Sequence, residues 1–288
     1  GTGAVRKCRA IYFGNHSMSI EKLRVGDIEI AHRWDGPADG PVVMMAHAMG
    51  TSHKIWDRQV PALVDRYRLL RYDWRGHGDT DAPPGPYTLA QFVADAIGTM
   101  DALGLEKVHW VGISTGGMIG PGPGIHHGDR LASLTLCNTT SISTPWYRDS
   151  VAKRQAVARQ GGMDPAWEMT KRLWFTDAYV DAAGPDFHAT RDVYVRTPVA
   201  GYLGGTSAVA DLAYRDLLHR IKTPTRIIAA GADPVTSVER SEEIHERIEG
   251  SQLMVIAGQR HFSNIEVPEQ FNPILRQGLD GFSGADAR

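Results

Sequence analysis

The fold of this 288-residue chain is decided by the stretch Val108-His109-Trp110-Val111-Gly112-Ile113-Ser114-Thr115-Gly116-Gly117. It begins as a short apolar strand and runs directly into Gly-x-Ser-x-Gly, a pattern typical of a sharp turn between a strand and a helix. A backbone that reverses so tightly leaves no room for Cβ atoms, so we expect Gly112 and Gly116 to lie where strand and helix nearly touch. Ser114 is then held at the tip of the turn with its hydroxyl exposed.

The helix after Ser114 directs its free backbone N–H groups at the serine, which favours negative charge developing there. The same segment contains the run Gly120-Pro121-Gly122-Pro123-Gly124. A proline costs a helix interior about 3 kcal/mol and a glycine about 1 kcal/mol. We therefore expect this helix to be short, or broken near Pro121.

Strand and helix patterns alternate from residue 41 onward, as in a mostly parallel, doubly wound sheet with helices on both faces. Including an N-terminal hairpin, eight strands are expected, at residues 20–25, 28–34, 41–46, 67–72, 108–113, 133–138, 225–230 and 252–256. Helices are expected near residues 54–64, 88–103, 238–249 and 268–279. Thr88 is the expected N-cap of the second helix and Gly104 its terminator. The fold class is α/β.

The alternation lapses between residues 145 and 219, where the sequence is helical in character and rich in aromatic residues. We interpret residues 145–219 as a helical cap inserted into a core made of residues 18–144 and 220–288. Most of the aromatic side chains should form a small core of their own, and one or two should face a ligand. Residues 1–17 are basic but lack the apolar centre of a signal peptide, so we expect an N-terminal extension.

The composition of the chain argues against several classes of binding partner. A formal net charge of −2 without a basic stripe argues against nucleic acid, and no apolar run reaches the length of about 18 residues that a membrane span needs. Cys8 and Cys137 are too few for a disulfide framework and lack a metal-ligand spacing, which favours a reducing compartment such as the cytoplasm. A small molecule is the expected partner, and the oligomeric state stays open.

A serine nucleophile needs a base to take its proton and a third group to orient that base. In chains with this turn the partners follow in the order serine, acid, histidine. Asp233 follows the expected strand 225–230, and His261 follows the expected strand 252–256. Both therefore lie at the carboxyl edge of the sheet, where Ser114 also emerges. We predict the catalytic triad Ser114, Asp233 and His261.

Two backbone donors should stabilise an oxyanion beside Ser114. The N–H of Thr115 is one, and the N–H of Met49, in the loop after the strand 41–46, is the other. His47 is expected to stabilise that loop. Asp73, Arg75 and His77 are expected to fix a tight loop of their own, with Asp73 accepting hydrogen bonds from backbone donors or from Arg75.

At this point the chain resembles the α/β-hydrolase superfamily over nearly its whole length from Met18, and within it the 3-oxoadipate enol-lactonases. The matching segments are Gly50-Thr51 with Trp56, Tyr72-Asp73-x-Arg75-Gly76-His77-Gly78, Gly112-Ile113-Ser114-Thr115-Gly116-Gly117-Met118-Ile119-Gly120, Leu136-Cys137-Asn138-Thr139 and His261-Phe262-Ser263-Asn264-Ile265-Glu266-x-Pro268-Glu269. The resemblance implies the same triad and oxyanion donors, a helical cap over the site and no cofactor. Two departures are Ala48, where many relatives have glycine, and the Pro-Gly run after Gly120. Neither removes a catalytic group.

The expected activity is hydrolysis of a small carboxylic ester or lactone through an acyl-enzyme. If the substrate carries carboxylates, as the enol-lactones of aromatic breakdown do, the cap should supply a cation. Arg148, Arg191 and Arg196 are the candidates, and Trp146 and Arg148 are the predicted substrate-binding residues.

Three alternatives stay open. A carbon–carbon bond hydrolase of ring-cleavage products, or a cofactor-free oxygenase or perhydrolase, would use the same fold. A ligand sensor that retains an idle triad would be no enzyme, and slow or single turnover on small esters would identify it.

Overall fold

A computed structural model describes residues 19–283 of the chain. The predicted N-terminal extension, residues 1–17, lies outside the described residues. Within them, the predicted hairpin at the N-terminal side of the sheet is present, with Gly26 at φ 55° in its turn. Such a φ favours glycine, which has no Cβ to clash with the backbone.

The described residues form one eight-stranded sheet, in the order β1-β2-β4-β3-β5-β6-β7-β8. The strands are β1 (Glu21–Val25), β2 (Ile28–Asp35), β3 (Val42–Ala46), β4 (Arg68–Tyr72), β5 (Val108–Ile113), β6 (Leu131–Cys137), β7 (Thr225–Ala230) and β8 (Gln252–Ile256). β2 pairs antiparallel with β1 and with β4, and all other pairs are parallel. The predicted mostly parallel, eight-stranded sheet is confirmed.

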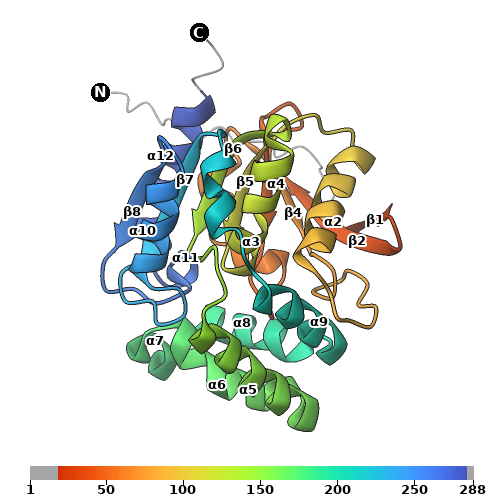
Figure 1. Ribbon diagram of the computed structural model, residues 1–288, viewed down its shortest axis with the longest axis vertical. Coiled ribbons are helices and arrows are strands. Elements are labelled where there is room, and N and C mark those ends of the chain that lie inside the picture. Colours follow the sequence, from red (N-terminus) through yellow and green to blue (C-terminus); the bar gives the residue numbers. More distant parts are fainter. Residues whose placement is uncertain (1–18, 284–288) are drawn as a thin grey trace, which may run out of the picture.

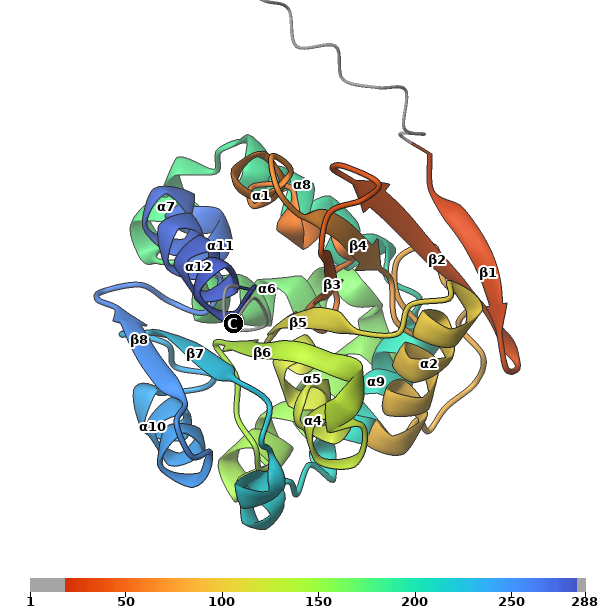
Figure 2. The same ribbon diagram turned by 90° about the horizontal axis from the view of Figure 1, so that it is seen from above.

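Helices cover both faces of this sheet, as predicted for a doubly wound fold (Figure 2). One face carries α2 (Leu89–Ala102), α4 (Pro121–His126) and α10 (Val238–Arg247), and the other carries α1 (Val60–Leu63), α11 (Ser263–Glu266) and α12 (Pro268–Ser283). Thr88 caps α2 through a reciprocal capping box with Gln91. Gly104, at φ 65°, follows its end. Both predicted boundaries of α2 are confirmed.

The segment behind Ser114 is broken, as the proline and glycine content predicts. α3 (Thr115–Ile119) ends before Gly120, and α4 begins at Pro121. Gly120 keeps helical dihedral angles, φ −51° and ψ −39°. The break is therefore a loss of hydrogen bonds, because Pro121 and Pro123 have no N–H to donate.

The single helix predicted near residues 54–64 is wrong. A 3₁₀ helix, η1 (His53–Trp56), and the short α1 take its place. Ser52 caps η1, and Pro61 lies in the first turn of α1, where its missing N–H costs nothing. Pro61 marks the start of this second helix, a boundary that the spacing of apolar residues alone does not show.

The helices between β6 and β7 gather beyond the end of the sheet at which β5 meets α3 (Figure 1). They are α5 (Pro145–Gly161), α6 (Met163–Trp174), α7 (Asp177–Ala182), α8 (Pro185–Arg196) and α9 (Val199–Ala210), followed by η3 (Arg215–Arg220). Their aromatic side chains pack mainly on one another: Trp167, for example, contacts the rings of Trp174, Phe187 and Tyr194. We keep residues 145–219 as our proposed cap.

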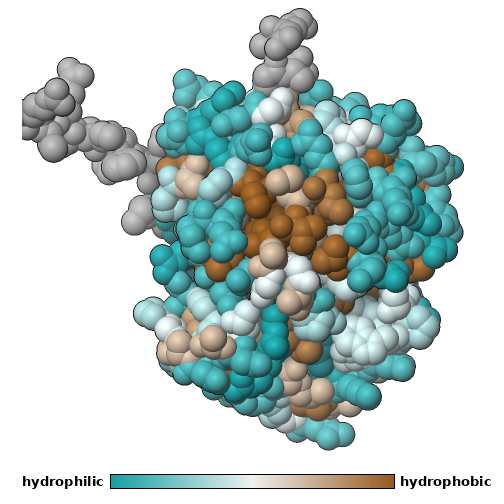
Figure 3. Space-filling view, turned by 90° about the vertical axis from the view of Figure 1, so that its left-hand side faces the viewer, coloured by the Kyte–Doolittle hydropathy of each residue, from teal (hydrophilic) through white to brown (hydrophobic). Residues whose placement is uncertain are grey.

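The β8 edge of the sheet exposes apolar surface. Figure 3 shows hydrophobic residues gathered on the side of the molecule that carries β8, and Val255 in this strand is 47% exposed. Among residues 19–283, no helix combines the length and apolarity that crossing a bilayer requires.

Candidate active site

Ser114 lies on a strained turn between β5 and α3. Its φ of 52° and ψ of −113° fall in a region that residues with a side chain rarely adopt, and such strain is concentrated at functional sites. Neighbouring segments hold the turn. The Ser114 N–H donates to Cys137 O (2.9 Å), and Thr139 Oγ1 donates to Ser114 O (2.8 Å). The end of β6 therefore fixes the backbone of Ser114 on both sides.

The two glycines of the turn are required by close approach. A Cβ on Gly112 would lie 2.2 Å from Gly116 O, and a Cβ on Gly116 would lie 2.2 Å from Ala46 O. Both distances are far below van der Waals contact, and both blocking atoms belong to the backbone. The prediction that these glycines let strand and helix nearly touch is confirmed.

The structure brings Ser114, His261 and Asp233 into one hydrogen-bonded chain. His261 Nε2 lies 2.8 Å from Ser114 Oγ, and His261 Nδ1 lies 2.6 Å from Asp233 Oδ2. All three side chains are buried, so the expectation of an exposed Ser114 is wrong. The distances are those that a nucleophile, a base and the group orienting the base require.

Asp233 is held by donors other than His261. Its Oδ1 accepts hydrogen bonds from the backbone N–H groups of Val235 (2.7 Å) and Thr236 (3.1 Å). Its Oδ2 accepts one from Thr236 Oγ1 (2.8 Å). Because each donor stabilises the ionised carboxylate, the loop after β7 presents an oriented negative charge to His261.

The loop that carries His261 is fixed from β6 and from α6. Asn138 Nδ2 donates to His261 O (2.6 Å) and to Ser263 Oγ (3.1 Å). The Phe262 N–H donates to Trp174 O (2.9 Å). Asn138 adopts φ 43°, which asparagine tolerates better than most residues. The sequence places Asn138 in a matching motif but indicates no role for it, since a positioning hydrogen bond leaves no local pattern.

Two backbone N–H groups beside Ser114 are unoccupied. Within the part of the chain that the structure describes, neither Met49 nor Thr115 donates a backbone hydrogen bond. Thr115 lies at the first position of α3, and the Gly116 N–H donates to His47 O (3.0 Å), which draws the Met49 loop against the start of α3. Both predicted oxyanion donors thus have free N–H groups, and their role beside Ser114 remains a proposal.

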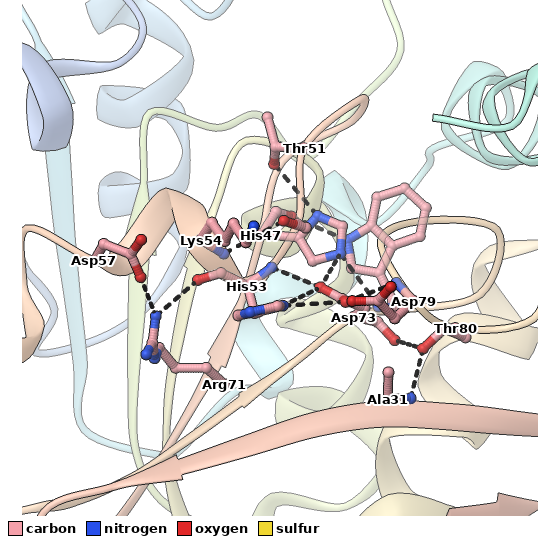
Figure 4. Close-up of polar contacts among 12 residues, drawn as sticks. Ala31, His47, Thr51, His53, Lys54, Asp57, Arg71, Asp73, Asp79 and Thr80 are labelled. Atoms are coloured by element: carbon pink, nitrogen blue, oxygen red, sulfur yellow. Dashed lines mark hydrogen bonds and ion pairs between the residues drawn. The ribbon is translucent and has the colours of Figure 1, made fainter. Parts of the chain in front are cut away.

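A buried polar network holds this loop to the end of β4 (Figure 4). Asp73 accepts hydrogen bonds from the backbone N–H groups of His53 (2.6 Å) and Asp79 (3.0 Å), and His53 Nδ1 lies 3.1 Å from both its oxygens. Burial alone would raise the pKa of Asp73, but its hydrogen bond and Coulomb interaction with His53, with further help from His47 and Asp79, hold the pKa below its ordinary value. The carboxylate is therefore a charged, fixed anchor.

Arg75 holds the loop after β4 as expected, through carboxylates that lie outside the loop. It donates to Asp95 and Asp27 and not to Asp73, whose expected backbone donors are present. Of the two kinds of donor expected for Asp73, the structure shows the backbone N–H groups of His53 and Asp79, while Arg75 donates to other carboxylates. Arg75 ties this loop to α2 and to the turn between β1 and β2.

His47 gives the site a dependence of stability on pH. Its Nε2 accepts from the Trp74 N–H (3.2 Å), and its Nδ1 lies 2.8 Å from Ala48 O. This pattern suits a neutral ring, and burial lowers the pKa of His47 from 6.5 to about 4. In the unfolded chain His47 binds a proton near pH 6.5, whereas in the folded chain it stays neutral down to about pH 4. The contribution of His47 to the free energy of unfolding is therefore complete above pH 6.5 and is lost as the pH falls toward 4.

We expect this histidine to contribute a loss of about 2 kcal/mol in the free energy of unfolding between pH 7 and pH 5. Urea denaturation at both pH values measures the loss in the wild type and in His47→Asn. The variant should show a smaller difference between the two pH values, whatever its stability at pH 7. His219→Asn is the control, because His219 is exposed. An unchanged difference in His47→Asn would contradict the assignment.

The predicted substrate-binding residues lie near the surface of the cap. Trp146 is 53% exposed and lines a surface groove that Tyr147, Pro234 and Arg240 share. Arg148 is exposed and donates to Ser143 O (2.7 Å). Contact of Trp146 and Arg148 with a substrate stays a prediction. Among residues 19–283, no group of three or more His, Cys, Asp or Glu side chains is arranged to hold a metal ion.

The other two candidate cations of the cap face solvent. Arg191 is paired with Asp164, and Arg196 lies 3.6 Å from Asp192. The buried cation of the cap is Arg154, which sequence reasoning missed. A signal existed, since Tyr147, Val151, Arg154 and Ala158 are the buried residues of α5 and follow the spacing of one helix face. An arginine among these positions indicates a cation on the buried face of the helix.

A family model described as the alpha/beta hydrolase fold matches residues 41–268. Among curated proteins, 3-oxoadipate enol-lactonase 1 of Acinetobacter baylyi is 35% identical over 241 residues, which cover 84% of this chain and 89% of the relative. Enol-lactonase 2 of the same organism is 29% identical over 266 residues, with 91% and 97% covered.

The chain is also similar to solved structures over nearly its whole length. The enol-lactonase from Burkholderia xenovorans LB400 superposes with a TM-score of 0.87 at 30% identity, covering 90% of this chain and 100% of that one. A structure described as a hydrolase from Pseudomonas aeruginosa PA01 also gives a TM-score of 0.87, at 33% identity, with 92% and 99% covered.

Proposed function

The chain belongs to the α/β-hydrolase family, and from this premise we propose that it is a serine hydrolase that cleaves a small carboxylic ester or lactone through an acyl-enzyme. One observation carries the proposal: Ser114 Oγ, His261 and Asp233 form a single hydrogen-bonded chain with distances of 2.8 and 2.6 Å. The names of the relatives favour a lactone, and in particular an enol-lactone.

Acylation begins when His261 Nε2 takes the proton of Ser114 Oγ and the oxygen attacks the carbonyl carbon of the substrate. The carbonyl oxygen becomes an anion that accepts hydrogen bonds from the N–H groups of Met49 and Thr115. Asp233 stabilises the imidazolium that forms. The ester bond then breaks, and His261 gives its proton to the departing oxygen.

Deacylation repeats these roles with water as the nucleophile. His261 takes a proton from the water, the hydroxide attacks the acyl carbon, and Ser114 Oγ leaves with the proton that His261 returns. The products are a carboxylic acid and an alcohol, and a lactone yields both in one molecule. An enol leaving group rearranges to a ketone. The proposed cap, residues 145–219, limits the access of water and shapes the pocket.

Steady-state turnover on a panel of small esters and lactones tests this proposal. We expect many turnovers per active site, release of acid and alcohol in equal amounts, and the same rate with and without oxygen. Mass spectrometry of the quenched enzyme should find the acyl group on Ser114. A need for oxygen, cleavage of a carbon–carbon bond, or a single turnover would each contradict the proposal.

A further inference from the structure

Thr115, the residue directly after the proposed nucleophile, carries a hydroxyl without a hydrogen-bond partner. Its side chain is fully buried, and Oγ1 makes no hydrogen bond with any group of residues 19–283. A buried hydroxyl that is left unpaired costs stability, because it gives up its hydrogen bonds to water. A valine of the same shape would avoid this cost, so we expect the hydroxyl to have a role.

Threonines inside other helices of the chain satisfy their hydroxyls locally. Thr99, Thr170 and Thr206 each donate to the backbone oxygen four residues earlier, at 2.7 Å. Thr115 has no such acceptor, because it is the first residue of α3 and the residues before Ser114 form the strand β5. The local backbone therefore offers its hydroxyl no partner.

The next two residues of α3 face the sheet. A Cβ on Gly116 would lie 2.2 Å from Ala46 O, at the end of β3. A Cβ on Gly117 would lie 2.6 Å from the Thr139 side chain, just after β6. Because successive residues of a helix point in different directions around its axis, Thr115 lies outside the face that these glycines press against the sheet.

Thr115 shares its face of α3 with Met118, since residues three positions apart in a helix are neighbours. The sulfur of Met118 lies 3.9 Å from Tyr147 Oη of α5, so this face is turned toward the proposed cap. The Cα–Cβ bonds of a helix tilt toward its N-terminus, which in α3 is the end next to Ser114. The Thr115 side chain is therefore directed to the space beside Ser114, beneath the proposed cap.

The hydroxyl lies beside the N–H group that we propose as an oxyanion donor. Only Cα and Cβ separate the nitrogen of a threonine from its Oγ1, so both can donate to one acceptor. In the described part of the chain, the Thr115 N–H donates no backbone hydrogen bond, whereas the Gly116 N–H donates to His47 O. An oxygen that accepts from the Thr115 N–H is therefore within reach of the Thr115 hydroxyl as well.

We propose that the Thr115 hydroxyl is a third donor to the oxyanion, in addition to the backbone N–H groups of Met49 and Thr115. The inference rests on the proposed function, because it assigns a further catalytic group to that same site. When Ser114 Oγ attacks, the carbonyl oxygen gains the electron pair of the C=O π bond and accepts a strong hydrogen bond from Oγ1. The proton stays on Oγ1 throughout. A donor without a competing partner needs no reorganisation as the charge forms.

Two substitutions of Thr115 test this donor through kcat and KM. Thr115→Val keeps the branched shape and removes the hydroxyl. With 4-nitrophenyl butyrate, it should lower kcat by about 10- to 100-fold, the range of one hydrogen bond to a charged group, and leave KM within about 2-fold. Thr115→Ser keeps a hydroxyl and should retain most of the wild-type kcat.

Thr135→Val is the matched control. Thr135 is also fully buried with an unpaired hydroxyl, but it lies within β6. Both valine variants remove an unpaired buried hydroxyl, so neither should have a lower melting temperature, and Thr135→Val should keep the wild-type kcat. An unchanged kcat in Thr115→Val, an equal loss of kcat in Thr135→Val, a rise in KM alone, or a lower melting temperature of Thr115→Val would overturn the proposal.

Inhibition by propyl trifluoromethyl ketone separates this inference from the proposed function. A serine oxygen adds to the ketone and forms an anion where the oxyanion of the ester would lie, so Ki should weaken in Thr115→Val by the factor that kcat/KM loses. Ester turnover that depends on Ser114, with equal Ki in the wild type and Thr115→Val, would reject the third donor alone. Ester turnover at the wild-type rate in Ser114→Ala would reject both the serine mechanism and the third donor.

Discussion

Ser114→Ala is expected to lower kcat for any accepted ester by about 10⁵- to 10⁶-fold. The variant loses the only oxygen that attacks the carbonyl, whereas the free N–H groups of Met49 and Thr115 and the rest of the site stay in place. Ser114 Oγ is hydrogen-bonded to His261, and alanine is as restricted at φ 52° as serine. The fold should therefore survive, with residual activity that reflects the oxyanion donors and binding alone.

Turnover of a 4-nitrophenyl ester at saturation, followed by its absorbance, measures the loss, and the melting temperature checks the fold. Ser133→Ala is the matched control. Ser133 is also a buried serine that is hydrogen-bonded to a histidine, His109, at 2.8 Å, but it lies on the strand β6. The control should keep its kcat within about 2-fold. Comparable activity in both variants would mean that Ser114 is not the nucleophile.

The meeting of the three residues of the proposed triad could be predicted from sequence because parallel strands end at one edge of a sheet. Asp233 and His261 each follow a strand whose apolar run is visible in the sequence, so topology alone places them near Ser114. Distances of 2.8 and 2.6 Å need more than topology. They depend on Asn138 and Thr236, each of which holds one of the two loops through two hydrogen bonds that no period or spacing reveals.

The side-chain contacts of a loop were harder to predict than its position in the chain. Asp73 and Arg75 lie two residues apart after β4, and this short spacing leaves a contact between them open as one way to hold the loop. In the structure, Arg75 forms ion pairs with Asp27 and Asp95 instead. Side-chain directions in an irregular loop depend on which distant partners are already in position, and Asp95 lies on α2, beyond the reach of any local pattern.

The helical character of the proposed cap, residues 145–219, could be predicted from the sequence, but the packing of its helices could not. Its helices and aromatic residues stand out in the sequence, but the choice among its arginines depends on which helix face is buried. Arg148, Arg191 and Arg196 were named because their type fits an anionic substrate. Arg154 has the same type and is buried, and only the packing of α5 against α6 and α9 shows this.

Asp233→Asn is expected to lower kcat by about 10⁴-fold, as the loss of the acid does in other serine triads. The reason lies in the donors around this side chain. Oδ1 accepts two backbone N–H groups, from Val235 and Thr236, and neither can change direction. The oxygen of an asparagine must therefore face these amides, which turns its NH₂ group toward His261 Nδ1.

An NH₂ group donates, so His261 Nδ1 must accept and the ring proton moves to Nε2. That proton then points at Ser114 Oγ, and Nε2 has no lone pair left to take the proton of the serine. Asp129→Asn, at an exposed aspartate, is the control. Single-turnover acylation by a 4-nitrophenyl ester should slow as much as kcat in Asp233→Asn, with the melting temperature close to that of the wild type. Acylation at the wild-type rate would show that Asp233 does not set the tautomer of His261.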